Sequence, residues 1–215
     1  MTSQEKETIS QLLASLFSPP DQEMLKQIHE ETLRSFFQDY MGSYGADSGL
    51  LGGFFTKGDP EILCKDLGEE YRRLFSEFSK ESVSLVESSY KPWTLDPRCT
   101  LPFGSDKGFL MGDSALHLLE IFRQCGLEVA DEFRGSPDHL VVELEFLSYL
   151  YRYATDLEVR QFMKDHLDWI PLLKDEIKRS DPHPFYRGAL EVLDLFLGNE
   201  RERLEGKGNG EKTIH

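Results

Sequence analysis

Residues 136–153 read Ser-Pro-Asp-His-Leu-Val-Val-Glu-Leu-Glu-Phe-Leu-Ser-Tyr-Leu-Tyr-Arg-Tyr, and this stretch decides the fold. Ser136 is a good N-cap, Pro137 suits the first helical position, and Asp138 places negative charge near the positive end of the helix dipole. Apolar side chains follow at 140–142, 144, 146, 147, 149–151 and 153. Because a single stripe cannot hold so many, we expect other helices to surround this one.

Polar residues stand at the start of this apolar helix. His139 and Glu143 are four residues apart and therefore share a helical face, with Asp138 beside them. Such a group could serve a hydrolase as a base and its orienting partner. The sequence contains no nucleophile elbow and no glycine-rich oxyanion turn, so a helix cap with a half-buried imidazole is the favoured interpretation.

Helical spacing of apolar residues continues through most of the chain. It predicts helices over residues 9–17, 21–37, 59–78, 113–125, 157–167, 169–177 and 185–197, with Asp21 and Asp113 as caps. No alternating strand pattern of useful length and no internal repeat is found. We predict an all-α fold, a single-domain bundle of roughly eight helices over residues 1–204, followed by a disordered tail at 205–215.

Two stretches interrupt the helical pattern. Residues 42–58 contain six glycines and predict a flexible loop, which lacks the Gly-Lys-Ser/Thr of a phosphate-binding loop. Residues 83–109, called the connector below, carry prolines and the aromatic residues Tyr90 and Trp93. Exposed, these rings would form a recognition surface; buried, they would attach the connector to the helices, and the second alternative is favoured.

The composition is strongly acidic. Lys and Arg number 24 against 39 Asp and Glu, a net charge of -15, which disfavours nucleic acid and anionic lipid and favours basic peptides. A need for solubility would explain the same charge. The N-terminus predicts no signal peptide and no window reaches 18 apolar residues, so we expect a cytoplasmic protein that does not insert into membranes.

Cysteine and histidine give no local metal motif. The three cysteines are far apart and predict reduced thiols, and none of the six histidines lies in a metal-binding pattern. His117 follows Asp113 by four residues and could pair with it, and a structural role is favoured over metal binding. We predict no cofactor and no metal; a metal site would require residues far apart in the sequence to converge, which sequence cannot show.

Three patches resemble the TorD/DmsD/NarJ family of redox-enzyme maturation chaperones. The first is residues 12–21, Leu-Leu-Ala-Ser-Leu-Phe-Ser-Pro-Pro-Asp, and the second is residues 70–75, Glu-Tyr-Arg-Arg-Leu-Phe, leading to Glu-Ser-Ser-Tyr at 87–90. The most specific is Gly-Asp-Ser at 112–114 followed, after a helix, by Pro-Asp-His at 137–139. Ser-Ser at 88–89 departs from the Pro-Pro that the family often has there.

The resemblance implies an all-α cytoplasmic chaperone, a monomer or dimer, rather than an enzyme. It would bind the twin-arginine signal peptide and the apo form of a molybdopterin oxidoreductase, assist cofactor insertion and delay export. Peptide contact is assigned to Tyr71, Leu74, Phe75, Tyr90, Pro92, Trp93, Pro137, Asp138, His139 and Glu143. Two alternatives stay open: an adaptor that binds the mature enzyme subunit without its leader, and, less favoured, a small hydrolase that uses Asp138 and His139.

Overall fold

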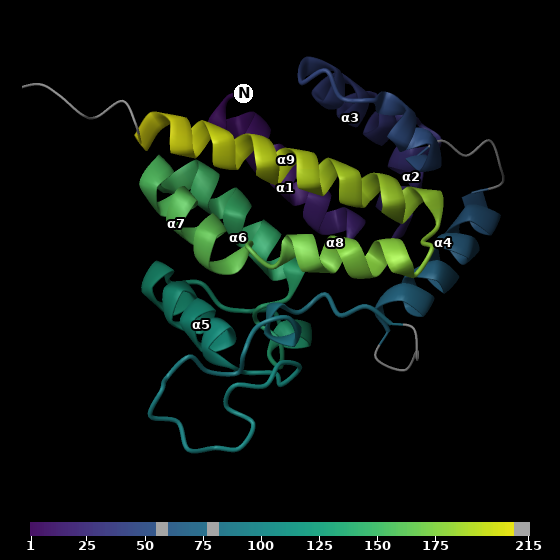
Figure 1. Ribbon diagram of the computed structural model, residues 1–215. Coiled ribbons are helices and arrows are strands. Elements are labelled where there is room, and N and C mark those ends of the chain that lie inside the picture. The colour runs from purple at the N-terminus through teal and green to yellow at the C-terminus, as the bar shows by residue number, and fades with distance from the viewer. Residues whose placement is uncertain (55–59, 77–81, 209–215) are drawn as a thin grey trace, which may run out of the picture.

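The computed structural model describes residues 1–54, 60–76 and 82–208, and these residues form an all-α fold, as predicted (Figure 1). Its α-helices are α1 (Ser3–Leu16), α2 (Gln22–His29), α3 (Thr32–Ser43), α4 (Pro60–Phe75), α5 (Asp113–Cys125), α6 (Leu140–Tyr153), α7 (Asp156–His166), α8 (Ile170–Arg179) and α9 (Pro184–Gly208). Short 3-10 helices are η1 (Ser48–Phe54), η2 (Glu87–Ser89) and η3 (Asp131–Phe133). Over these ranges, no helix combines the length and the apolar character needed to cross a bilayer.

Helix α6 lies at the centre of the fold. Ten of its 14 residues are buried, and α1 and α7 pack directly against it. The long α9 crosses the molecule and contacts α1, α3, α7 and α8 (Figure 1). The expectation that other helices surround residues 140–153 is therefore confirmed.

The start of α6 differs from the prediction. Residues 136–139 form a turn in which the His139 amide donates to the Ser136 carbonyl at 3.1 Å. His139, not Ser136, is the N-cap, and its Nδ1 accepts a hydrogen bond from the Val141 amide at 3.2 Å. The predicted cap therefore lies three residues too early.

Pairing with the connector explains this later start. The Asp138 carbonyl accepts from the Glu87 amide at 2.9 Å, and the Leu140 amide donates to the Leu85 carbonyl at 2.8 Å. These bonds make an isolated antiparallel bridge centred on Val86. Extended backbone is needed for that bridge, so the helix begins only after it.

The structure also differs from the predicted helix boundaries at two other places, between α2 and α3 and at the start of α5. The predicted helix over 21–37 is two helices, because Glu31 adopts a left-handed conformation with φ of 58° between α2 and α3. Asp21 does cap α2, accepting from the Met24 amide at 2.8 Å. Asp113 lies inside α5 instead of capping it, and its carboxylate accepts from the Thr94 hydroxyl in the connector at 2.9 Å.

Part of the glycine-rich segment over 42–58, where a flexible loop is predicted, packs against α9. Helix α3 extends to Ser43, and η1 packs on α9. A Cβ on Gly53 would lie 2.1 Å from the Pro184 carbonyl carbon, and one on Gly188 would lie 2.7 Å from the Phe54 ring. Glycine here permits close approach of two elements.

The predicted tail overlaps the end of α9. Helix α9 continues to Gly208, so residues 205–208 are helical. The remainder of that tail, residues 55–58 of the predicted loop, and the expected helix ends Asp59 and Phe78 fall outside the described ranges.

Candidate functional site

Buried polar side chains gather where the connector meets α6. The Asp138 side chain is fully buried, and its Oδ2 accepts hydrogen bonds from both the amide of Ser88, at 2.8 Å, and the Ser88 hydroxyl. Burial raises the pKa of the Asp138 carboxyl, although the two Ser88 hydrogen bonds oppose the shift. The carboxylate therefore fastens the connector to the segment that precedes α6.

Glu87 of η2 connects the cluster to α7. Its side chain is fully buried, with Oε2 lying 3.0 Å from His166 Nδ1 and Oε1 forming a 2.5 Å ion pair with Lys91 Nζ. Burial raises the pKa of Glu87, but the hydrogen bonds and charges of His166 and Lys91 outweigh it, so the net pKa is lowered. Lys91 also pairs with Asp168 at 2.5 Å, at the edge of the cluster.

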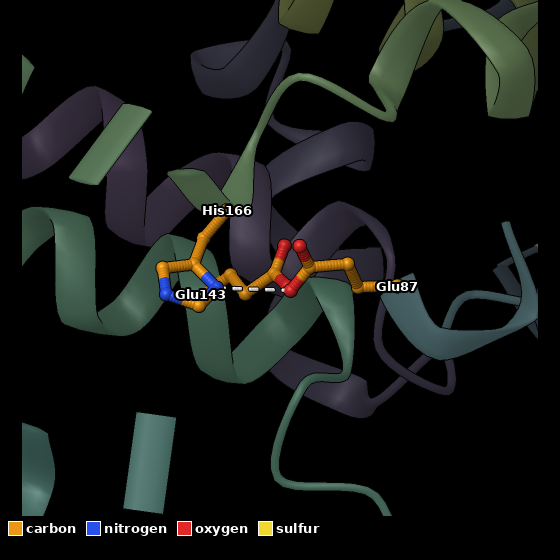
Figure 2. Close-up of side chains that lie close together, drawn as sticks. All are labelled: Glu87, Glu143 and His166. Carbon is orange, nitrogen blue, oxygen red and sulfur yellow. Dashed lines mark hydrogen bonds and ion pairs between the residues drawn. The ribbon is translucent and has the colours of Figure 1, made fainter. Parts of the chain in front are cut away.

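Glu143 completes the cluster from the first turn of α6. It is fully buried, and its Oε2 accepts from Trp169 Nε1 at 3.1 Å. Its Oε1 accepts no hydrogen bond from any residue in the described ranges. Burial, followed by the negative charge of Glu87, raises the pKa of Glu143 well above its usual range. Glu87, Glu143 and His166 point toward one another (Figure 2).

A pair of histidines links this cluster to the surface. His166 Nε2 lies 2.8 Å from His117 Nδ1, and the two rings stack with centroids 4.9 Å apart. His166 is buried whereas His117 is exposed. His117 therefore pairs with His166 and not with Asp113.

The connector aromatics are divided between interior and surface. Tyr90 is buried, stacks on Trp169 with centroids 5.0 Å apart, and donates its hydroxyl proton to Glu176 at 2.9 Å. Trp93 is half-buried and meets the Phe103 ring edge to face at 5.4 Å. Pro92 is also half-buried. Tyr90 thus attaches the connector, and Trp93 keeps a partly accessible ring.

The predicted residues of α4 belong to a different part of the core. Leu74 is fully buried, and Tyr71 and Phe75 are partly buried. The Phe75 ring centroid lies 6.4 Å from that of Phe17, just after α1, and 5.5 Å from that of Tyr186 in α9. These contacts give the α4 residues a role in packing that is separate from the polar cluster.

The side chains of Asp138 and His139 both accept hydrogen bonds from backbone amides. Asp138 bonds Ser88, and His139 Nδ1 accepts from the Val141 amide. Burial lowers the pKa of His139 to about 4, so the ring is neutral at physiological pH. Pro137 is buried beside them. This arrangement does not form the base and orienting partner of the hydrolase alternative.

An apolar pocket beside His139 was not foreseen in the sequence. It has a volume of about 230 Å³ and lies between the end of α5, η3 and α6. Its apolar walls are Phe122, Leu127, Val129, Phe133, Phe146 and Tyr149. The Phe133 ring packs on His139 with centroids 4.9 Å apart, so the pocket adjoins the Pro-Asp-His segment.

Carboxylates rim this pocket. Glu128 and Glu145 are part of its lining. Desolvation raises the pKa of Glu145, and the negative charge of Glu132 raises it further. The alternation of acidic and apolar residues in Leu-Glu-Val-Ala-Asp-Glu-Phe at 127–133 was the signal that could have indicated such a rim. The pocket can accept a ligand that is both apolar and cationic.

Comparisons with known proteins place these features in a family. Residues 57–175 match the family model described as nitrate reductase delta subunit. The chaperone protein TorD of Vibrio cholerae serotype O1 is 26% identical over 125 residues, covering 51% of this chain and 57% of TorD. TorD of Salmonella newport is 28% identical over 106 residues, covering 46% and 49%. The chain therefore spans about half the length of the curated relatives it matches.

Proposed function

The chain belongs to the TorD/NarJ family of redox-enzyme maturation chaperones, and from this premise we propose that it binds the twin-arginine leader of a molybdopterin-dependent oxidoreductase. In this role it holds the apoenzyme in the cytoplasm, assists insertion of the cofactor and delays export. The chain acts by binding and performs no catalysis of its own.

The observation that carries this proposal is the acid-rimmed apolar pocket beside His139. A twin-arginine leader joins two guanidinium groups to an apolar segment. The pocket offers phenyl and aliphatic walls to the apolar segment, and Glu128 and Glu145 are available to guanidinium. The net charge of -15 adds long-range attraction for a cationic peptide.

We assign the two acidic parts of this region different roles. The resemblance assigns Asp138 to peptide contact. Its carboxylate is fully buried and already accepts from Ser88, so we give Asp138 the task of holding the connector in place. Guanidinium contact is assigned instead to Glu145 and Glu128 at the pocket.

Titration calorimetry with synthetic leaders tests the function. The protein is titrated with the leader of an oxidoreductase encoded near its gene and, in parallel, with a version in which both arginines are lysines. We expect a dissociation constant of about micromolar for the first and weaker binding of the second, because lysine keeps the charge but loses the bidentate geometry. Absence of heat with either leader would contradict the proposal.

A second candidate function rests on the connector. Three large apolar side chains of the connector and one directly after it are exposed: Leu95 at 79%, Leu101 at 47%, Phe109 at 44% and, after the connector, Leu110 at 44%. An exposed apolar surface of this kind suits docking of a protein partner. An adaptor using it would bind the mature oxidoreductase subunit after its leader has been deleted, whereas a leader-dependent chaperone would lose that binding.

A further inference from the structure

We propose that Glu87, Glu143 and His166 form a binding site for one divalent transition-metal ion. The three residues come from η2, from the first turn of α6 and from the end of α7. One ligand atom from each lies within 4.8 Å of the others, and their side chains converge on one point (Figure 2). An ion at that point would join three segments that are separate in the sequence.

The buried carboxyl groups of the cluster outnumber its ammonium partners. Glu87, Asp138 and Glu143 are all fully buried, and Lys91 is the ammonium group that pairs with Glu87. Burying a carboxylate without a partner is costly, and buried charges are generally paired or bound to a metal. Glu143 Oε1 is such an atom, since no described residue donates a hydrogen bond to it and its carboxylate faces Glu87 (Figure 2).

Each proposed ligand has its other polar atom fixed by a neighbour. These outer contacts are Glu87 Oε1 to Lys91 Nζ at 2.5 Å, Glu143 Oε2 to Trp169 Nε1 at 3.1 Å, and His166 Nε2 to His117 Nδ1 at 2.8 Å. Metal-binding carboxylates and imidazoles in proteins are oriented by outer partners of this kind. The arrangement leaves Glu87 Oε2, Glu143 Oε1 and His166 Nδ1 as the inward-facing ligand atoms.

A cavity borders the imidazole of the cluster. A cavity of about 290 Å³ is lined by both His117 and His166, and by the acidic residues Glu158 and Asp165. His117 is exposed, whereas His166 is buried. The cavity therefore places two further carboxylates beside the imidazole of the cluster, where they favour the approach of a cation to His166.

The ligand set indicates the class of metal. Mg²⁺ and Ca²⁺ prefer shells made of oxygen alone, whereas one imidazole with two carboxylates suits Zn²⁺, Mn²⁺ or Fe²⁺. Three protein ligands leave room for water to complete the coordination. Zn²⁺ is the probe of choice because it has no redox chemistry to complicate the measurement.

The test measures Zn²⁺ uptake by the full chain after chelator treatment. Zinc is titrated against a competing chromophoric chelator, with excess Mg²⁺ present to occupy exposed carboxylates. We expect one Zn²⁺ per chain and a rise in the unfolding temperature on binding. Glu143→Gln keeps the shape of the side chain and is expected to weaken Zn²⁺ binding more than tenfold with the helical circular dichroism retained. Glu145→Gln, which removes an acid from the same helix, should leave binding unchanged.

Further variants guard against a failure to fold. His117→Ala alters only an exposed outer partner and is expected to weaken Zn²⁺ binding by about 10–100-fold. If Glu143→Gln unfolds, His166→Gln takes its place. The proposal is overturned if the wild type takes up no zinc, which would leave a proton on Glu143 to satisfy its oxygen, or if the Glu143→Gln and His117→Ala variants bind zinc as tightly as the wild type.

Discussion

Asp138 accepts two hydrogen bonds from Ser88 through one carboxylate oxygen, the first from the amide at 2.8 Å and the second from the hydroxyl. The two residues lie 50 positions apart, in the connector and just before α6. Because both are buried, neither donor can turn to water if the carboxylate is removed. This pair is therefore a specific attachment between the connector and the helical body.

Asp138→Ala should loosen the connector without melting the helices. It leaves the buried Ser88 amide and hydroxyl without an acceptor, for an expected loss of about 1–3 kcal/mol in the free energy of unfolding, measured in urea. Asp131→Ala, at an exposed position of η3, is the control and should change stability by less than about 0.5 kcal/mol. Equal effects of the two variants would show that the Ser88 bonds carry no special weight.

Glu145→Gln should weaken leader binding about tenfold, because a charge-assisted hydrogen bond to guanidinium is replaced by a weaker neutral one. Calorimetry at two salt concentrations measures the affinity and should show a shallower salt dependence for this variant. Glu202→Gln makes the same charge change at an exposed site on α9 and is the control. Unaltered affinity for Glu145→Gln would remove the pocket from the proposed site.

Trp93→Ala distinguishes the pocket from the connector as the leader-binding surface. Trp93 packs on Phe103 within the connector and is not part of the pocket lining. Leader affinity within about twofold of wild type is expected if the pocket is used, whereas a loss of ten times or more would place the leader across the connector, as the resemblance implies.

The sequence was sufficient for the features that depend on local patterns. The apolar density of residues 140–153 correctly indicated a central helix, and Asp21 correctly marked the start of a helix. The sequence was insufficient where a contact with a distant backbone segment changes the local structure. Val86 pairs with His139 and delays α6, a contact between segments that carries no local signal. Glycines at 52–53 suggest flexibility in the sequence, although Gly53 serves close packing against α9.

The buried cluster illustrates the same limit for sites. Glu87 and His166 are 79 positions apart, and no sequence motif joins them. The sequence drew attention to Pro-Asp-His at 137–139, but Asp138 and His139 accept hydrogen bonds from backbone amides. Glu143 is the residue that faces Glu87 and His166 (Figure 2). Convergence of this kind is determined by how η2, α6 and α7 pack, so single-sequence reasoning identifies residue types but not their neighbours.

Stability should fall in mild acid through His139. Its folded pKa of about 4 lies below the unfolded value of 6.5 because burial disfavours the charged ring. The neutral form is therefore favoured by folding, and the free energy of unfolding should be unaffected above pH 6.5 and decrease as pH falls from 6.5 towards 4. The full loss is at most roughly 3 kcal/mol. Protonation also removes the acceptor that caps the Val141 amide.

Urea unfolding at a series of pH values checks this dependence. His139→Gln removes the titrating group, so the difference in unfolding free energy between variant and wild type should change across that pH window. His29→Gln, at an exposed histidine, should follow the wild-type curve. If the two variants show the same pH dependence, the slope arises elsewhere in the molecule.

Gly53→Ala should destabilise the contact between η1 and α9. The added Cβ would lie 2.1 Å from the Pro184 carbonyl carbon, a backbone atom that cannot move aside alone. We expect a loss of about 1–3 kcal/mol in the free energy of unfolding. Gly52→Ala provides a matched control, because its Cβ would meet nothing within 4 Å. Equal stability of the two variants would contradict close packing as the reason for glycine at 53.

A buried ion pair between α1 and α9 gives the last prediction. Lys6 Nζ lies 3.2 Å from Glu200 Oε2, and both side chains are almost fully buried. Glu200 also accepts from the Tyr151 hydroxyl at 3.1 Å and from Arg203 at 2.8 Å. Burial lowers the pKa of Lys6, while the charge of Glu200 opposes that shift. The charged form of Lys6 therefore depends on Glu200 for its stabilisation, whereas Glu200 has other partners besides Lys6.

Single and double variants should reveal this asymmetry. Glu200→Gln leaves the Lys6 ammonium buried without its counter-charge, for an expected cost of about 3–5 kcal/mol in urea unfolding. Lys6→Met should cost less, because Arg203 still pairs with Glu200. In the double variant, Lys6→Met should recover most of what Glu200→Gln loses, since no charged group at position 6 is left to desolvate. Additive losses would instead mean that the two side chains stabilise the fold independently and that their ion pair contributes nothing.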